Sequence, residues 1–428
     1  MVTTSKATAR SAAEISTNPL SPPSRKGSAY LISYGVALVG SAVSSLTPVS
    51  VTLALRIGAI DPVGKNTAYG LAVGIGTLLG MFVTPLAGLL SDATYSRRGM
   101  RIPWLVVGSF GTLLAAYPLS QVPNVAGVFL CWALMTLFIS LGFSPLMAII
   151  QDQLPESQHG IASGMAGTAP FLGGLLGSWI VQLLPQTPFN LFVIPAALGG
   201  AMILQFLIFL DDKTQSRSKV LKVKVWQFLQ GFRFDWRTNP SFAWLLLVVA
   251  TSWTGMAVMQ TYMVYILQDQ IKVGTSLLAG AAFQGFVASN TTAAGVSLLG
   301  GAFSDWLGRR RAVYACGVVL LALGLVAQAL SSSMSVFLFG CLVAGVGSGL
   351  MTGLTWALAA EASADRATSG RDMGLIVFAF TLPTAVVPLA APALLSTGGG
   401  GNYAVLFFVC AAVTFLGAPL LALVHRVR

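Results

Sequence analysis

Charged residues are scarce in this chain. They make up 9% of its 428 residues, against about 25% in an ordinary soluble domain, whereas 55% of the residues are hydrophobic. A soluble core cannot use that much apolar surface, so the excess must face lipid. The shortage of charge therefore excludes a soluble fold and predicts an integral membrane protein over most of the length.

The groups on which enzymes depend are also few. The two histidines, His159 and His425, lie near the ends of apolar runs, and no set of His, Asp and Glu has the spacing of metal ligands. No glycine-rich phosphate loop followed by Lys and Ser or Thr occurs. We therefore expect no metal, no cofactor, no enzymatic activity and no self-contained ATP-driven pump. The four cysteines all fall inside apolar runs, so no disulfide is expected.

Acidic residues are missing from the middle of the apolar runs. All 13 of them lie in terminal or connecting segments or at the ends of runs. A charge in mid-membrane costs about 3 kcal/mol and usually marks an ion pathway. The nearest candidate for coupling to a proton or another ion is Asp152, at the end of the fourth run.

What the chain does contain is a series of twelve apolar runs, each long enough to cross a bilayer as a helix. Six precede a polar, basic segment and six follow it. The expected organisation is a disordered cytoplasmic tail at 1–27, a six-helix bundle at 28–210, a linker at 211–240, a second six-helix bundle at 241–424 and a short terminus at 425–428. The expected spans are 30–55, 68–90, 103–120, 125–150, 161–184, 189–210, 241–267, 277–302, 312–331, 334–360, 372–396 and 402–424.

Basic residues are distributed unevenly between the two sides of these spans. With the N-terminus in the cytoplasm, all of the 24 lysines and arginines face inward except Arg56, Lys65 and Lys272. An asymmetry of this size places both termini in the cytoplasm. It also excludes a nucleic-acid partner, because the basic residues flank spans, where anionic lipid is the expected partner. The basic, aromatic stretch 219–237 is expected to lie on the inner membrane face, with a solvated tether as the alternative.

One polar motif occurs twice. Each copy is Gly-x-x-x-Asp at the end of an apolar run, followed by arginines, and the two aspartates are about half a chain apart. Ordinary charged loops would explain the arginines but not the matched Gly-x-x-x-Asp, so the repeat predicts two equivalent halves. The motif residues are Gly88, Asp92, Arg97, Arg98 and Arg101 in the first copy, and Gly301, Asp305, Gly308, Arg309, Arg310 and Arg311 in the second.

The second copy resembles the loop that joins the second and third, and the eighth and ninth, helices of the major facilitator superfamily, although Trp306 stands where a basic residue is usual. The first copy resembles the sucrose-type and glycoside-type branches of that superfamily. The resemblance implies an all-α fold of about twelve transmembrane helices in two pseudo-symmetric bundles. It also implies an inner gate, in which Asp92 faces the start of the eleventh span near 371–374 and Asp305 faces the start of the fifth near 160–163.

Two further marks of related carriers are incomplete. The fourth span has Pro145 and Asp152 in the sucrose-type pattern, but Met147 replaces the arginine that is common there. The fifth span has Ala169 in place of the first glycine of the Gly-Pro-x-x-Gly-Gly run of drug–proton antiporters. The first departure weakens the sugar assignment, and the second keeps export of a drug-like compound open.

Neutral amides and hydroxyls within the spans would bind a polar solute, and tryptophan rings would stack on the apolar face of a sugar. An amide that faced lipid would be left unpaired, which favours a binding role for the amides. For the tryptophans, packing or lipid contact is the alternative. The substrate-binding candidates are Trp253, Gln260, Tyr262, Gln284, Asn290 and Trp356.

These observations predict a secondary active or facilitative carrier of a small polar organic solute, sugar-like or glycoside-like, that works by alternating access. Proton-coupled export of an amphipathic compound is the alternative. A non-transporting sensor and a membrane enzyme are the alternatives from other classes. We expect a monomeric, multi-pass protein of the cell membrane, whose partners are the solute, anionic lipid and, if transport is coupled, a proton or another ion.

Overall fold

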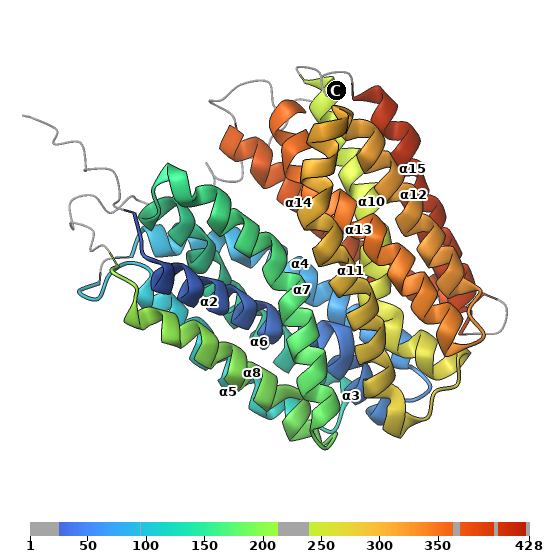
Figure 1. Ribbon diagram of the computed structural model, residues 1–428. Helices are drawn as coiled ribbons and strands as arrows, with labels where there is room; N and C mark the ends of the chain where they lie inside the picture. Colours follow the sequence, from blue (N-terminus) through green and yellow to red (C-terminus); the bar gives the residue numbers. More distant parts are fainter. Residues whose placement is uncertain (1–24, 95, 213–238, 363–368, 398–400, 425–428) are drawn as a thin grey trace, which may run out of the picture.

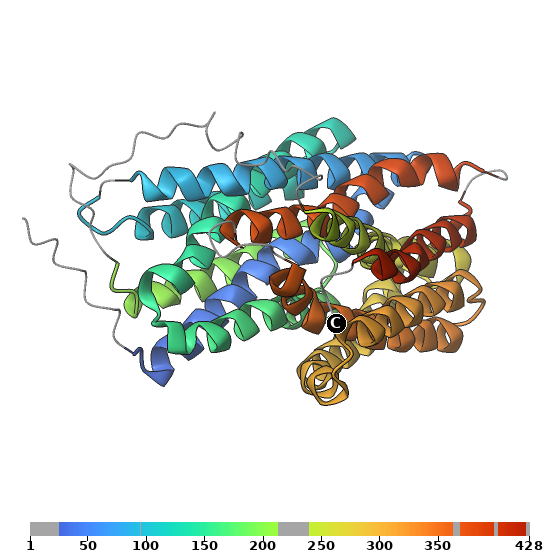
Figure 2. The same cartoon turned by 90° about the horizontal axis from the view of Figure 1, so that it is seen from above.

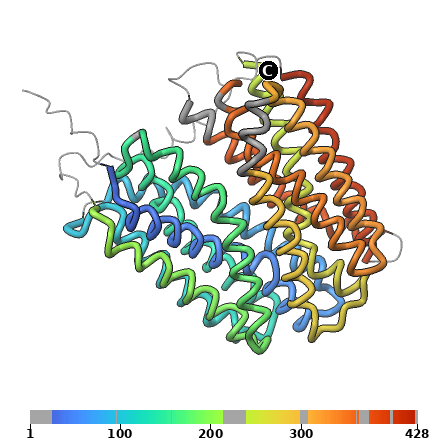
Figure 3. The backbone as a smooth tube through the Cα atoms, in the orientation of Figure 1, coloured from blue at the N-terminus to red at the C-terminus, as the bar shows by residue number. Residues whose placement is uncertain are grey.

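The structure is a computed structural model that describes residues 25–94, 96–212, 239–362, 369–397 and 401–424. The tail over 1–24, most of the linker over 213–238, and residues 425–428 lie outside the described part, and so do the side chains of 156, 298–306, 360 and 369–373. The interfacial role expected for 219–237 therefore stays a prediction. Figure 3 traces the chain through two halves, one ending at residue 212 and the other beginning at residue 239.

The first half contains six membrane-length helical spans, and the first of them is broken. Pro48 has no backbone N–H, so it cannot continue the regular hydrogen-bond ladder, and a π-helical segment occupies this position. The spans are α2 (Ser28–Thr47) continued by η1 (Pro48–Thr52) and α3 (Leu53–Ile60), α4 (Lys65–Asp92), α5 (Ile102–Gln121), α6 (Val125–Gln153), α7 (Glu156–Leu183), and α8 (Pro188–Leu204) continued by η2 (Gln205–Ile208).

The second half repeats this arrangement. Its first span also contains a π-helical segment, which here lies at the end of the span, after Tyr265. The spans are α10 (Pro240–Tyr265) continued by η4 (Ile266–Gln270), α11 (Leu278–Leu307) after the short η5 (Thr275–Leu277), α12 (Arg310–Ala329), α13 (Met334–Ala362), α14 (Ser369–Leu395), and α15 (Tyr403–Leu420) continued by η6 (Leu421–Leu423).

Polar caps fix several helix starts. The side chains of Asn124, Thr187, Asn239 and Asn402 each accept a hydrogen bond from a backbone N–H three residues later. Such a bond satisfies one of the donors that a helix leaves unpaired in its first turn. Asn124, Thr187 and Asn402 lie in short connections between apolar runs, so the chain turns there, whereas Asn239 ends the linker between the halves.

Eleven of these spans are apolar and long enough to cross a membrane. The remaining span, α11, has 30 residues and occupies the corresponding place in the second half. Amides and hydroxyls along this helix lower its hydropathy; they include Gln284, Ser289, Asn290, Thr291 and Thr292. The all-α architecture of two six-helix halves predicted from the sequence is confirmed.

The two halves meet at one end and stand apart at the other (Figure 1). We call the end with the α3–α4 connection the closed end, and the end with residues 25, 212, 239 and 424 the open end. Across the seam α4 packs against α14, α7 packs against α11, and α10 touches η1 and α3. Seen from above, the halves lie side by side (Figure 2).

Glycines allow the backbones to approach at the closed end. A Cβ atom on Gly70 would lie 2.2 Å from the carbonyl oxygen of Pro388, and one on Gly74 would lie 2.4 Å from Cγ of Leu389. Towards the open end the glycines have free space around them. A Cβ on Gly160, Gly164 or Gly167 of α7 would meet nothing within 4 Å. The seam is therefore tight at one end and free at the other.

We expect Gly70→Ala to lower the free energy of unfolding by about 1–3 kcal/mol, because the added methyl group must displace a backbone carbonyl rather than a flexible side chain. Gly164→Ala is the matched control, since it makes the same change inside a helix where space is open. Thermal unfolding of the purified variants in detergent measures the difference. Equal melting temperatures for the two variants would contradict the close contact of α4 with α14.

Candidate functional site

The closed end is sealed by polar contacts between the halves. Lys65 at the start of α4 forms an ion pair with Asp269 of η4, with 2.7 Å between Nζ and Oδ1. The Tyr403 hydroxyl lies 2.6 Å from Oδ2 of the same aspartate and 2.9 Å from Oδ1 of Asn66. Lys65 also donates to Oε1 of Gln268 at 3.2 Å. One lysine thus holds two neighbouring residues of the opposite half.

Three buried tyrosines lie next to this ion pair. The rings of Tyr69, Tyr262 and Tyr265 have centroid separations of 5.3 to 6.4 Å. The Tyr265 hydroxyl donates to the carbonyl oxygen of Ala54 in the opposite half at 3.0 Å, and the Tyr69 hydroxyl donates to the carbonyl oxygen of Val49. Both carbonyls lie in or just after the π-helical segment of the first span. Tyr69 and Tyr265 therefore satisfy backbone groups in and just after the distorted segment.

Among the described residues, the hydrogen bonds and ion pairs that join the two halves all lie at this closed end. The sequence reasoning located a gate only at the other end, and it missed this one. Lys65 was visible as one of three basic residues on the sparse side. The pairing with Asp269 was not, because the partners are 204 residues apart.

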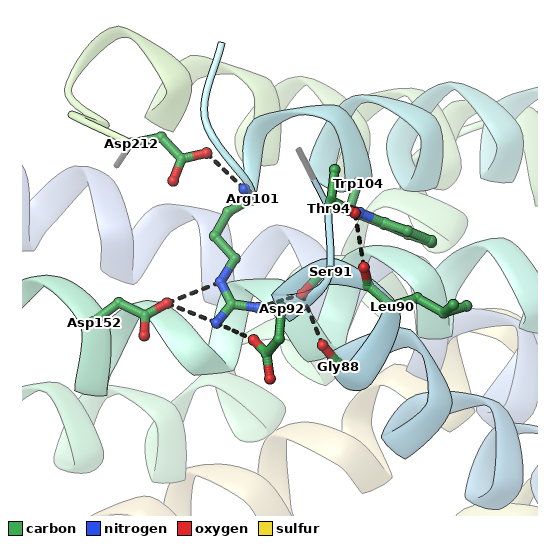
Figure 4. A network of polar contacts seen from close by, with 9 residues as sticks. All are labelled: Gly88, Leu90, Ser91, Asp92, Thr94, Arg101, Trp104, Asp152 and Asp212. Carbon is green, nitrogen blue, oxygen red and sulfur yellow. Dashed lines mark hydrogen bonds and ion pairs between the residues drawn. The ribbon is translucent and has the colours of Figure 1, made fainter. Parts of the chain in front are cut away.

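At the open end, Arg101 of the first motif copy is buried among acids (Figure 4). Its Nη2 lies 2.6 Å from Oδ1 of Asp92 and 2.8 Å from Oδ2 of Asp152, and its side chain is 4% exposed. Its Nε also donates to Asp152 at 2.8 Å, and its Nη1 donates to Ser91. The guanidinium thus fastens the ends of α4 and α6 to the start of α5.

Asp212, after the last span of the first half, extends this cluster. Its Oδ2 accepts a hydrogen bond from the backbone N–H of Arg101 at 2.6 Å (Figure 4), and another from the backbone N–H of Ile102 at 2.8 Å. Burial raises the pKa of the Asp212 carboxyl, and the backbone N–H groups at the start of α5 oppose that rise. Position 99 requires a glycine for two reasons. Its φ is +99°, and a Cβ there would lie 2.2 Å from Cγ of Asp212.

The second half contains an equivalent ion pair. Arg310, at the start of α12, donates to Glu361 near the end of α13. Arg101 and Asp152 stand at the equivalent ends of α5 and α6, and both pairs are separated by 51 residues. In each half an arginine at the start of the third span therefore binds an acid at the end of the fourth.

The structure separates the motif residues that the sequence grouped as one gate. Arg97, Arg98, Gly308 and Arg309 are exposed, whereas Arg101 is buried and Arg310 binds an acid. Gly308 has a φ of +62°, which a turn between α11 and α12 requires. A Cβ on Gly88 would approach Oγ of Ser144 to 2.8 Å, so this glycine lets α4 pack on α6. Arg311 is partly buried.

The expected contacts of Asp92 and Asp305 with the opposite halves stay predictions. Asp92 pairs with Arg101 in its own half and is 49% exposed. The side chains of Gly301 and Asp305, and of the first residues of α14, lie outside the described part of the chain.

Two of the substrate-binding candidates are brought together by a third aromatic ring. Trp253 of α10 stacks on Phe380 of α14 with centroids 5.0 Å apart. Trp356 of α13 meets the same ring edge-on at 6.0 Å, and it is 44% exposed. Phe380 was not among the sequence candidates, because nothing distinguishes it from the 23 other phenylalanines.

The other candidates are placed differently. Gln260 lies seven residues from Trp253, hence on the same face of α10, and both are partly exposed while the intervening Thr254–Met259 are buried. Gln284 is exposed on α11, and Asn290 of that helix lies 3.2 Å from the Cβ position of Gly174 across the seam. Tyr262 is fully buried in the closed-end tyrosine cluster.

We expect Arg101→Gln to destabilise the fold, because it leaves two carboxylates without their cation. The cost is about 1–3 kcal/mol, less than for a fully buried pair because Asp92 is half exposed. Arg98→Gln removes the same charge from an exposed position of the same loop and is expected to change stability by less than about 0.5 kcal/mol. Thermal unfolding in detergent measures both. A melting temperature for Arg101→Gln equal to that for Arg98→Gln would show that the ion pairs contribute nothing.

We expect Lys65→Gln to open the closed end. The pair is partly exposed, so its loss costs about 1 kcal/mol, which changes a population ratio about fivefold. Spin labels at Val63 and Leu277, which are 97% and 69% exposed on opposite halves, report the separation once the two native cysteines that are not buried, Cys131 and Cys316, are replaced by serine. Lys272→Gln, at an exposed lysine near this end, is the control. Unchanged distance distributions for Lys65→Gln would rule out the seal.

The amino-acid sequence matches one protein family. A family model described as Major Facilitator Superfamily matches residues 31–295 and 286–428. No curated protein matches the sequence.

Solved structures share the fold at low identity. A mutant of the nucleoside transporter NupG is 13% identical and covers 92% of this chain and 99% of its own, with a TM-score of 0.71. A bacterial homologue of the human lysosomal transporter Spinster is 13% identical, with coverages of 92% and 97% and a TM-score of 0.69. A D-xylose-proton symporter is 15% identical, with coverages of 93% and 97% and a TM-score of 0.68.

Proposed function

The chain belongs to the major facilitator superfamily of transporters, and we propose on that premise that it carries a small, neutral, polar organic solute with a ring in its structure. The solute binds between the two halves, against the aromatic group of α10, α13 and α14. Transport proceeds by alternating access, in which the closed end and the open end exchange states.

The open end faces the cytoplasm in this proposal. It carries the motif arginines, and the closed end carries Arg56, Lys65 and Lys272. The excess of basic residues on one side favours that side as cytoplasmic. The conformation is then inward-facing, sealed on the outside by Lys65, Asp269 and the tyrosines. Both termini lie inside, and the cell membrane remains the expected location.

The aromatic group is the observation that carries the substrate proposal. Trp253, Phe380 and Trp356 come from three helices and form one continuous ring surface. Helix α10 touches η1 and α3, and α14 packs on α4, so two of the three helices border the opposite half. Ring surfaces of this kind stack on the flat apolar face of a sugar or a heterocycle.

Neutral amides supply the polar contacts. Gln260 shares the face of α10 that presents Trp253, and α11 adds the exposed Gln284 and the partly exposed Asn290. An amide has donors and an acceptor, so it suits hydroxyls and ring nitrogens better than a charged group. A sugar, glycoside or nucleoside fits this combination. The nucleoside and xylose transporters among the structural neighbours support the class of small polar solutes.

Export of an amphipathic compound is a second candidate. The same aromatic surface suits it, and the partial Gly-Pro run at Ala169 and Pro170 of α7 is consistent with it. The amides on α10 and α11 favour the polar solute instead, because an amphipathic compound leaves them unpaired.

Coupling to an ion remains a proposal centred on Asp152. This carboxylate accepts hydrogen bonds from Arg101, and Arg310 and Glu361 form the equivalent pair in the other half. A pair repeated in both halves has the features of a fixed structural contact. Coupling through Asp152 therefore requires that Arg101 release it during the cycle; otherwise transport is facilitative.

The substrate is found by measuring the thermal stabilisation of the purified protein by sugars, glycosides, nucleosides and amphipathic cations, followed by flux of the best ligand into proteoliposomes. We expect Trp356→Leu to weaken that ligand about tenfold, because the lost stacking is worth about 0.5–1.5 kcal/mol beyond the area buried. Trp244→Leu is the control, since Trp244 is a similarly exposed tryptophan near the start of α10. A stabilising sugar or nucleoside whose affinity is insensitive to Trp356→Leu would contradict the proposed site, and stabilisation by amphipathic cations alone would favour export.

A further inference from the structure

A cleft lies at the closed end, away from the aromatic group formed by Trp253, Phe380 and Trp356. It contains about 700 Å³ of empty space, part of it open to solvent. Both halves contribute to it: α3 and the start of α8 on one side, and η4, η5 and the start of α11 on the other. The polar residues that line it are Arg56, Gln186, Gln268 and Thr275.

Arg56 is the charged residue in this lining. Its Nη2 donates to the carbonyl oxygen of Val122 at 2.7 Å, while its Nε is buried and has no partner among the described residues. No acidic side chain is among the described residues that line the cleft, and the nearby Asp269 is already paired with Lys65. Because the described lining offers this guanidinium no acidic partner, an anionic oxygen that enters the cleft would form a charge-assisted hydrogen bond with it.

The rest of the lining is apolar, and it continues onto the surface. Ala54, Leu55, Leu191 and Leu278 form the apolar part of the cleft. Exposed apolar side chains stand close to lining residues along the chain: Leu183 three residues before Gln186, Phe189 just after Pro188 and Leu277 just before Leu278 are 60%, 43% and 69% exposed. A ligand that fits must therefore combine an anionic head with apolar chains.

We propose that this cleft binds an amphipathic phosphate, with the phosphate group on Arg56 and the amides of Gln186 and Gln268, and with its acyl chains along the flanking apolar residues. An anionic phospholipid supplies this chemistry, and its phosphate group alone is also present in a soluble phosphate ester. The site is separate from the proposed substrate site.

Binding here favours the conformation in which the closed end is shut. The lining is complete only while the two halves meet, because Arg56 and Gln186 belong to one half and Gln268 and Thr275 to the other. A ligand shifts an equilibrium in proportion to its differential affinity for the two states. The phosphate ligand therefore stabilises the conformation in which the closed end is shut.

The test compares two isosteric variants of neighbouring glutamines. Gln186→Glu adds a negative charge to the lining and leaves the bond from Arg56 to Val122 intact. Gln182→Glu adds the same charge four residues earlier, to an exposed side chain that faces Gly280 rather than the cleft. Because the chain has a net charge of +11, anionic lipid binds elsewhere too, and only the difference between the variants is informative.

The melting temperature is measured in detergent micelles titrated with phosphatidylglycerol, with phosphatidylcholine, or with soluble glycerol phosphate. We expect phosphatidylglycerol to stabilise the native chain and Gln182→Glu at similar concentrations, and Gln186→Glu to need at least about tenfold more, as stabilisation follows ligand concentration relative to Kd. Arg56→Gln is expected to behave like Gln186→Glu, with Arg56→Lys in between.

A response to phosphatidylglycerol alone identifies a lipid as the ligand, and an additional response to glycerol phosphate shows that the phosphate group suffices. Equal titrations for Gln186→Glu and Gln182→Glu would overturn the proposal, as would an equal response to phosphatidylcholine. This readout does not depend on the transported solute, so it stands or fails separately from the proposed function.

Discussion

The close approach of α4 to α14 at one end of the seam is the constraint from which the other features follow. Lipid offers no hydrophobic force to press helices together, so contact depends on small residues that let backbones meet. Gly70 and Gly74 provide this, and the tyrosines of the closed end then reach carbonyls of the broken first span. Towards the open end, the glycines of α7 face open space. The same residue type thus serves a tight contact and a free surface, depending on what lies opposite.

The ion pairs of the open end have a different role, because they hold each half together rather than joining the halves. Arg101 binds acids from α4 and α6, and Arg310 binds an acid from α13. A half whose helices are joined by internal ion pairs can rotate as a rigid body, so that only the contacts at the seam change during transport. Asp92 is half exposed, so the predicted exchange of Arg101 for a partner in the opposite half would begin at this residue.

The sequence predicted the class of fold and the two halves, because these depend on composition and period. It also marked Arg101 and Asp152 as functional candidates, though not as partners. The 51-residue spacing shared by Arg101 with Asp152 and by Arg310 with Glu361 was a signal that the repeat could have revealed. Lys65 with Asp269, and Phe380 between two tryptophans, could not be predicted, because the partners come from helices whose relative rotation is set by packing over the whole seam.

Helix α10 connects the proposed solute site with the closed end. One face carries Trp253 and Gln260, next to the proposed solute, and its last turn carries Tyr262 and Tyr265, which close the opposite end. The helix is almost fully buried between these positions, so it is supported along its length and transmits a displacement rather than absorbing it. A solute that draws α10 towards the other half therefore acts on the Tyr265 contact through a rigid element. The π-helical turn η4, which follows immediately and carries Asp269, is where that displacement can be accommodated without breaking the helix above it.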